Sequence, residues 1–298
     1  MKRFHPFRIH NHALMALCFN PDTPGIPVIL LHGITASIYF WEPGLVAPFR
    51  QYGPCYALSL PGHYPATFPV DFAPDDLTAE TIAQVLTTAI RELVGDSPVL
   101  LVGHSTGGFA ALDIAAHTPE IARGVISIAG FAHGQWTGAL GLYQRWARAG
   151  ALGHWAFKTV YGSAKRSYGI FRQASRMYTP KPKRVFAYPN LDATAKQESF
   201  PAYQKLNLDA MLLYFRRMPD IDITSLLPRI TAPTLALTGD RDPIVPPAQA
   251  HLIAKQVPAA ELAVLDSEVG HLPFYEVPDA YQRAISDWLC AYLPTKDE

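Results

Sequence analysis

Short apolar runs, rich in Val, Ile and Leu and bounded by Gly or Pro, recur along the chain. They cover residues 26–33, 55–62, 98–105, 124–130, 233–240 and 261–266. Their hydrophobicity is continuous and does not alternate, which is typical of strands that are covered on both faces. We therefore expect these runs to form the buried strands of one sheet.

Amphipathic helical patterns lie between the runs. Residues 77–95 place apolar side chains at helical spacing, with Thr78 as the expected N-cap. Residues 281–292 repeat the same spacing near the C-terminus. Strands that alternate with helices predict a mostly parallel α/β sheet with helices on both faces. A short pair of strands around residues 10–12 is expected at the edge of this sheet.

The alternation stops between Phe131 and Leu227, where the sequence has no clear strand run and is rich in aromatic residues. We predict a helical insertion at 131–227 and a core made of 1–130 and 228–298. Residues 132–218 carry 14 basic and three acidic residues, a net charge of +11. Because the whole chain has a net charge of zero, the remainder carries −11.

Composition limits the class of protein. With 298 residues, 49% of them hydrophobic and 17% charged, the chain is typical of a globular protein. Its three cysteines are scattered, which favours a reducing compartment over a disulfide framework or a zinc site. No apolar stretch reaches the roughly 18 residues that cross a bilayer, and none resembles a secretory leader. We expect a cytoplasmic protein with no cleaved leader and no transmembrane segment.

The run at 98–105 leads into "GHSTGG", in which Gly103, Ser105 and Gly107 fit the pattern G-x-S-x-G. Between a buried strand and a helix, this pattern indicates a sharp turn that presents a serine Oγ above the sheet. The bare pattern also arises by chance, so a structural turn is the alternative. The context favours Ser105 as a nucleophile.

A serine nucleophile needs a base, and the base needs an acid that orients it. Two later strand ends offer them: "LTGDRDPIVP" contains Asp240 and Asp242, and "SEVGHLPFYE" contains His271. The order serine, aspartate, histidine is the one expected for this architecture. The sequence contains no P-loop, dinucleotide fingerprint, clustered metal ligands or nucleic-acid-binding motif, so we expect no organic cofactor, no metal and no nucleic-acid partner.

Taken together, "LLHGITASIYFW", "GHSTGG", "TGDRDPIVP" and "GHLPFYEVPDAY" make the sequence resemble the α/β-hydrolase superfamily, in its lid-bearing serine hydrolase branch. The resemblance implies an α/β-hydrolase fold in which the insertion is a lid. It also selects Asp242 over Asp240 as the acid. The backbone N–H groups of Ile34 and Thr106 are then expected to form the oxyanion hole. Serine at position 105 excludes those members whose nucleophile is an aspartate.

The implied function is a serine hydrolase that cleaves a carboxylic ester or thioester of an apolar acyl group through an acyl-enzyme. Ser105 would attack, His271 would transfer protons, and Asp242 would orient the imidazole. An acyltransferase, a perhydrolase or a carbon–carbon bond hydrolase would use the same residues, and a slow ligand receptor of the same fold is the alternative outside catalysis.

The insertion leaves two questions open. Its aromatic residues either line an apolar substrate pocket or form the core of the insertion itself. Its basic charge is either an ordinary solvated surface or a binding site for an anionic carrier, such as an acyl carrier protein or CoA, or for anionic lipid.

Overall fold

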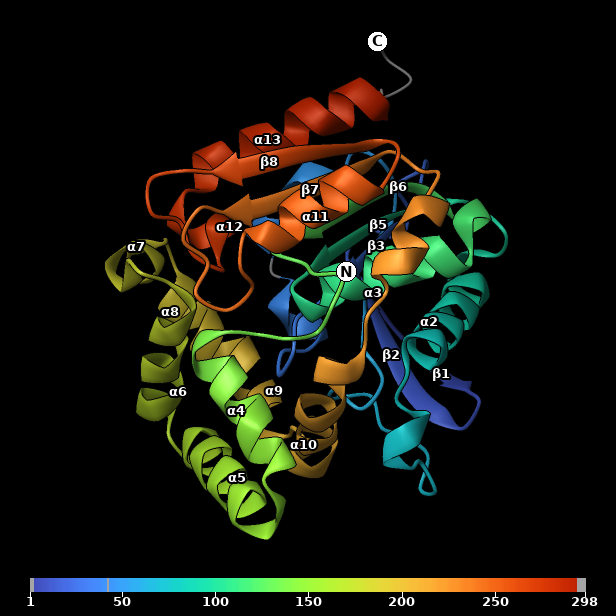
Figure 1. Cartoon of the computed structure of the whole chain (residues 1–298). Coiled ribbons are helices and arrows are strands. Elements are labelled where there is room, and N and C mark those ends of the chain that lie inside the picture. Colours follow the sequence, from blue (N-terminus) through green and yellow to red (C-terminus); the bar gives the residue numbers. More distant parts are fainter. Residues whose placement is uncertain (1–2, 42, 294–298) are drawn as a thin grey trace.

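The computed structural model describes residues 3–41 and 43–293, and within them the centre is an eight-stranded sheet (Figure 1). Its strand order is β1-β2-β4-β3-β5-β6-β7-β8. The strands are β1 (Arg3–Ile9), β2 (His12–Cys18), β3 (Val28–Leu31), β4 (Cys55–Leu58), β5 (Val99–His104), β6 (Ala122–Ile128), β7 (Thr234–Gly239) and β8 (Ala260–Leu265). Strand β2 pairs antiparallel with β1 and β4, and the other neighbours are parallel. The predicted sheet is confirmed, although the predicted core ends, residues 1–2 and 294–298, lie outside the described residues.

The apolar runs form the central strands because they are covered on both faces. Every residue of β3, β5 and β7 is buried. The expectation of full cover is wrong for the last run, which forms β8. Leu262 and Val264 in this strand are 37% and 39% exposed. As the outermost strand, β8 lies at the rim of the sheet, where the covering helices reach only part of it.

Helices pack on both faces of the sheet, as expected for buried parallel strands (Figure 1). On one face lie α2 (Ala79–Val94), α3 (Thr106–His117) and α11 (Ala248–Gln256). The other face is covered by α1 (Pro43–Val46), α12 (Pro273–Glu276) and α13 (Pro278–Tyr292). The predicted cap of α2 is confirmed, because Thr78 Oγ1 accepts a hydrogen bond from the Thr81 N–H at 3.1 Å.

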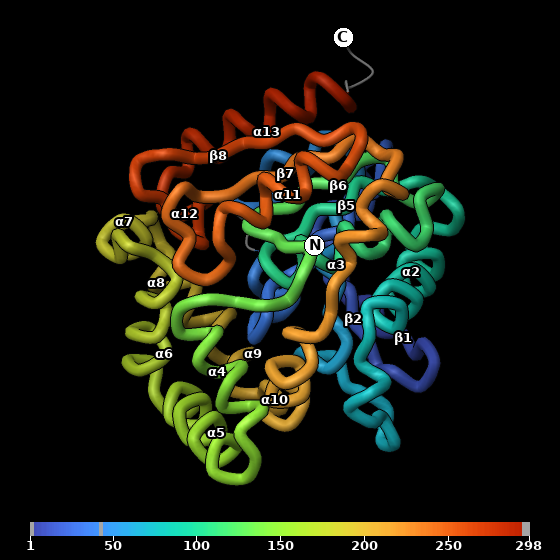
Figure 2. The backbone as a smooth tube through the Cα atoms, viewed as in Figure 1, coloured from blue at the N-terminus to red at the C-terminus, as the bar shows by residue number. Residues whose placement is uncertain are grey.

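Between β6 and β7 the chain forms a helical segment that lies along one side of the sheet (Figure 2). It contains α4 (Gly138–Arg148), α5 (Gly150–Arg166), α6 (Tyr168–Ala174), α7 (Pro182–Ala187), α8 (Leu191–Thr194), α9 (Phe200–Gln204) and α10 (Leu208–Arg217). Some of its aromatic side chains form an internal core. Phe157 has its ring centroid 4.5 Å from that of Tyr161 and 5.1 Å from that of Phe215. These rings hold α5 against α10.

Short helical turns complete the described elements. The 3-10 turns are η1 (Ile38–Phe40), η2 (Ala47–Phe49), η3 (Pro74–Asp76), η4 (Pro119–Ile121), η5 (Ser175–Tyr178), η7 (Met218–Asp220) and η8 (Thr224–Arg229), and η6 (Ala195–Ser199) is π-helical. Across residues 3–41 and 43–293, none of the helices combines the length and hydrophobicity needed to cross a membrane.

Candidate active site

The turn between β5 and α3 places Ser105 in a strained backbone conformation. Its φ is +55° and its ψ is −118°, a combination that residues other than glycine rarely adopt. The flanking glycines make this turn possible, because a Cβ on Gly103 would lie 2.0 Å from the Gly107 carbonyl oxygen, and one on Gly107 would lie 2.1 Å from that of Leu31. The pattern G-x-S-x-G is thus explained by close backbone approach on both sides of the serine.

The loop after β3 passes directly beside Ser105. A Cβ on Gly33 would lie 3.2 Å from the Ser105 Cβ, and Ile34 lines the same cavity as Ser105. Thr106 is the first residue of α3, where backbone N–H groups have no intrahelical acceptor and the helix dipole is positive. The two residues expected to form the oxyanion hole therefore flank the serine from the β3 loop and from the helix start.

His32 shapes the loop after β3. Burial lowers the pKa of His32 to about 4, so its imidazole is neutral. Its Nδ1–H donates to the Gly33 carbonyl at 2.9 Å, and its Nε2 accepts from the Leu60 N–H at 3.2 Å. These contacts fix the loop that carries Ile34.

The structure brings Asp242 and His271 together, from the loops after β7 and β8. Asp242 Oδ2 accepts from His271 Nδ1 at 2.6 Å, and both side chains are almost fully buried. The other carboxylate oxygen accepts from the N–H groups of Ile244 and Val245 at 2.8 and 3.0 Å. Asp240 instead accepts backbone N–H groups of the neighbouring loop. Of the two candidate acids, Asp242 is therefore the one in contact with the histidine.

A second histidine supports the backbone of His271. Burial, followed by the proximity of His271, lowers the pKa of His104 well below its ordinary value. The neutral His104 donates through Nε2–H to the His271 carbonyl oxygen at 2.9 Å. This contact joins the end of β5, beside Ser105, to the loop that carries the candidate base.

Sequence reasoning gave no role to two residues that contact the His271 loop. Glu276 stands five positions after the histidine, inside the quoted motif, and its buried carboxylate accepts N–H groups of that loop. The signal in the sequence that could have identified Glu276 was an acidic residue among apolar neighbours. Tyr178 of the helical segment accepts the His271 N–H. Nothing in the sequence distinguishes Tyr178 from the other aromatic residues around it.

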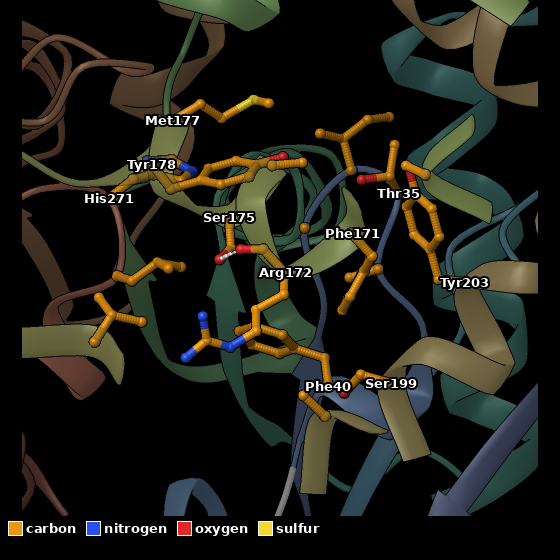
Figure 3. Close-up of a pocket in the computed structure, with 18 of the residues that line it drawn as sticks. Thr35, Phe40, Phe171, Arg172, Ser175, Met177, Tyr178, Ser199, Tyr203 and His271 are labelled. Carbon is orange, nitrogen blue, oxygen red and sulfur yellow. Dashed lines mark hydrogen bonds between the residues drawn. The ribbon is translucent and has the colours of Figure 1, made fainter. Parts of the chain in front are cut away.

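A cavity of about 230 Å³ is lined by Ser105, by His271 and by residues of the helical segment, some of which Figure 3 shows. Its lining is mostly apolar and aromatic, so the aromatic residues of this segment both form its core and line a pocket. Arg172 also lines the cavity, but its Nε donates to Asp192 Oδ1 at 2.7 Å and its guanidinium lies 4.1 Å from the Phe186 ring centroid. The aromatic lining includes Phe40, Tyr143, Tyr161, Tyr168, Phe171, Tyr178, Phe186, Tyr203 and Tyr275.

The part of the chain that the structure describes contains no group of three or more His, Cys, Asp or Glu side chains arranged to hold a metal ion. The polar groups around the cavity instead match those of acyl transfer, with a serine, a histidine–carboxylate pair and backbone donors. A family profile for the α/β hydrolase fold matches residues 26–278. The chain belongs to the α/β-hydrolase family.

Other comparisons agree with this α/β-hydrolase assignment. The chain is 26% identical over 270 residues to a pimeloyl-[acyl-carrier protein] methyl ester esterase of Neisseria meningitidis serogroup C, covering 88% of this chain and 93% of that protein. It is 24% identical over 297 residues to the putative carbamate hydrolase RutD of Pseudomonas syringae, covering 96% and 98%.

Solved structures share the fold of this α/β hydrolase. The enol-lactonase of Burkholderia xenovorans LB400 superposes with a TM-score of 0.74 at 14% identity, covering 96% of this chain and 99% of that chain. A thermophilic esterase of Thermogutta terrifontis superposes with a TM-score of 0.71 at 20% identity, covering 97% and 99%.

Proposed function

We propose that this α/β hydrolase cleaves a carboxylic ester or thioester of an apolar acyl group through a covalent acyl-enzyme. The observation that carries the proposal is the buried contact of 2.6 Å between His271 Nδ1 and Asp242 Oδ2, in which His271 lines the same cavity as Ser105. The contact leaves His271 Nε2 as the nitrogen available to a serine hydroxyl.

The proposed acylation begins when Ser105 Oγ attacks the acyl carbon and its proton passes to His271 Nε2. The negative charge that develops on the acyl oxygen is stabilised by the N–H groups of Ile34 and Thr106. The carbon–oxygen or carbon–sulfur bond to the leaving group then breaks, and His271 returns its proton to the leaving group. Asp242 holds the imidazole and stabilises its charged form. Water repeats the sequence on the acyl-enzyme and releases the acid.

The helical segment at 131–227 acts in this proposal as a lid over a core made of 1–130 and 228–298. Its residues supply most of the cavity wall, and seven of them are aromatic, which suits an uncharged acyl chain. Arg172 in the cavity lining pairs with Asp192, which offsets its charge at this position.

We also propose that the ester is attached to an anionic carrier that contacts the basic lid. Relatives named as esterases of an acyl-carrier-protein ester support this proposal, as does the net charge of +11 on residues 132–218. Five lid cations pair with carboxylates, whereas Arg145, Arg166 and Lys183 are exposed and have no ion-pair partner among the described residues. Such unpaired charge attracts an acidic partner.

Fluorophosphonate labelling of the wild type and of Ser105→Ala tests the nucleophile. We expect labelling of the wild type and none of the variant, together with hydrolysis of p-nitrophenyl esters at a chain length set by the cavity. Equal labelling of the Ser105→Ala variant would remove Ser105 from its proposed role. Steady turnover of many equivalents separates an enzyme from a ligand receptor.

A further inference from the structure

Tyr178 of the helical segment contacts both halves of the candidate site. Its carbonyl oxygen accepts the His271 N–H at 2.8 Å, and its ring stacks on the His271 imidazole with centroids 5.9 Å apart and planes at 23°. Tyr178 lines the same cavity as Thr35, the residue after Ile34, and the Thr35 side chain acts on its hydroxyl group. Figure 3 shows the ring lying between His271 and Thr35. One residue thus links the candidate base to the loop of the oxyanion hole.

The hydroxyl contact falls on a strained part of that loop. Thr35 has a φ of +60°, which is uncommon for a β-branched residue and needs support from its surroundings. Burial raises the pKa of Tyr178 to about 12, and the Thr35 side chain opposes this rise. The phenol therefore stays protonated at neutral pH.

Thr179, the next residue, extends the contact to the other side of His271. Its buried hydroxyl donates to Glu276 Oε2 at 2.5 Å. The same carboxylate accepts the Gly270 N–H at 3.0 Å and the Leu272 N–H at 3.2 Å. With the Tyr178 contact, all three consecutive N–H groups at 270–272 are bound.

The backbone at 178–179 packs closely against the histidine loop at Gly270. A Cβ on Gly270 would lie 2.7 Å from the Tyr178 carbonyl oxygen and 2.8 Å from the Thr179 Cα. Because these neighbours are backbone atoms, they cannot move aside without displacing the segment. The helical segment therefore packs directly on the histidine loop at this point.

We infer that Tyr178, Thr179 and Glu276 form a histidine clamp, through which the helical segment positions His271 and the Thr35 loop for the reaction. The inference rests on the proposed function and deepens it: the segment orders the chemical groups as well as enclosing substrate. The three are positioning residues, because they act through His271 and Thr35. Separation of Tyr178 and Thr179 from the core would release both the base and the oxyanion loop, so the site is complete only while this contact is made.

Conservative variants of Tyr178 and Thr179 test the two side chains of the clamp separately. Tyr178→Phe removes only the hydroxyl on which the Thr35 side chain acts. Thr179→Val removes the hydroxyl that donates to Glu276 and accepts the Lys181 N–H. For each we expect kcat for a p-nitrophenyl ester, and the rate of fluorophosphonate labelling, to fall by about 10-fold or more while KM changes less than about twofold, since small misplacement of reacting groups is costly. Thr179→Ser keeps the donor and should restore the rate.

Matched controls lie far from the cavity. Tyr292→Phe on α13 and Thr88→Val on α2 remove hydroxyls of the same types, with hydrogen bonds to Glu261 and to the Gln84 carbonyl, and should leave kcat unchanged. A proton NMR signal from the His271 Nδ1–H shared with Asp242 gives a readout independent of turnover. Thr179→Val should shift or broaden this signal, and Thr179→Ser should not.

The clamp is overturned if Tyr178→Phe and Thr179→Val match their controls in kcat and labelling rate, or if Thr179→Val lowers only the melting temperature with kcat and the NMR signal unchanged. Failure of the proposed function itself is a different result, namely labelling of Ser105→Ala or no ester hydrolysis by the wild type. Should Thr179→Val not fold, Tyr178→Phe, with the wild-type Thr179, still decides the inference through kcat and labelling.

Discussion

Asp242 and His271 share a hydrogen bond of 2.6 Å in which each partner is almost fully removed from water. The second oxygen of Asp242 is held by two backbone N–H groups, so the carboxylate cannot turn away from the imidazole. With Nδ1 in this hydrogen bond, Nε2 is the His271 ring nitrogen left for a partner in the cavity that His271 lines.

Asp242→Asn should lower kcat by roughly 10³- to 10⁴-fold with little change in the folded structure, because the amide favours the wrong imidazole tautomer. The measurement is steady-state hydrolysis of a p-nitrophenyl ester, with circular dichroism to verify folding. Asp240→Asn is the matched control, because Asp240 binds only the backbone of Glu268 and Val269. A larger loss in Asp240→Asn than in Asp242→Asn would contradict the assignment of the acid.

Gly107→Ala should prevent stable folding, because its Cβ would lie 2.1 Å from the Leu31 carbonyl oxygen and 2.7 Å from that of His32. Gly162→Ala, in α5, meets nothing closer than an Arg166 side-chain atom at 3.9 Å. That variant should stabilise the protein by about 0.5–1 kcal/mol, the usual helix preference for alanine over glycine. Thermal unfolding of both variants gives the comparison, and a Gly107→Ala protein of normal stability would show that the turn adapts.

Stability should fall as pH rises through the range in which Asp113 and His117 titrate. Burial raises the pKa of Asp113 from 3.8 to about 6, so between these values the folded state retains a proton that the unfolded state has released. The contact of His117 Nδ1 with the Asp113 carboxylate at 3.0 Å is the main cause that raises the pKa of His117 above 6.5. The stabilising contribution of His117 is therefore present below 6.5 and lost as pH rises through that raised pKa. Asp113 and His117 therefore both make the folded protein less stable as pH rises.

Asp113→Asn removes the carboxyl titration, and we expect a flatter dependence of the free energy of unfolding on pH between about 4 and 7. Urea unfolding at several pH values measures it. Asp96→Asn, at an exposed turn, should retain the wild-type slope. An unchanged slope in Asp113→Asn would show that the buried pair does not control this dependence.

Charge reversal on the lid tests the proposed carrier. Replacing Arg145, Arg166 and Lys183 by glutamate should raise KM for an ester linked to acyl carrier protein by about 10-fold or more at low salt, because an acidic partner is then repelled. The effect should shrink at high ionic strength. Hydrolysis of a short p-nitrophenyl ester serves as the internal control, since it needs no carrier and should be unaffected. Equal KM values for the carrier ester before and after reversal would leave the basic charge as an ordinary solvated surface.

Local patterns predicted much of the fold. A strand that is buried between two layers of helices needs apolar residues at successive positions. The apolar runs therefore locate the central strands within a few residues of the observed bounds. The same reasoning failed for β8, because exposure at the rim depends on where the strand lies in the sheet, and its sequence is as apolar as its neighbours. The catalytic roles of Ser105, Asp242 and His271 stay a prediction. All three residues follow the carboxyl ends of parallel strands, where sites of α/β sheets are found.

The sequence by itself predicted the strands of the core, their order along the chain and the loops that carry the candidate catalytic groups, because each depends on residues that are close along the chain. Residue spacing left Asp240 and Asp242 both open and only the resemblance favoured Asp242, whereas the tertiary structure places Asp242 in contact with His271. Only the tertiary structure showed that the helical segment contacts the histidine loop. The hydrogen bond between Thr179 and Glu276 joins residues 97 positions apart. Such contacts arise from the packing of whole elements, and a side chain that makes one has no distinguishing pattern in its own neighbourhood.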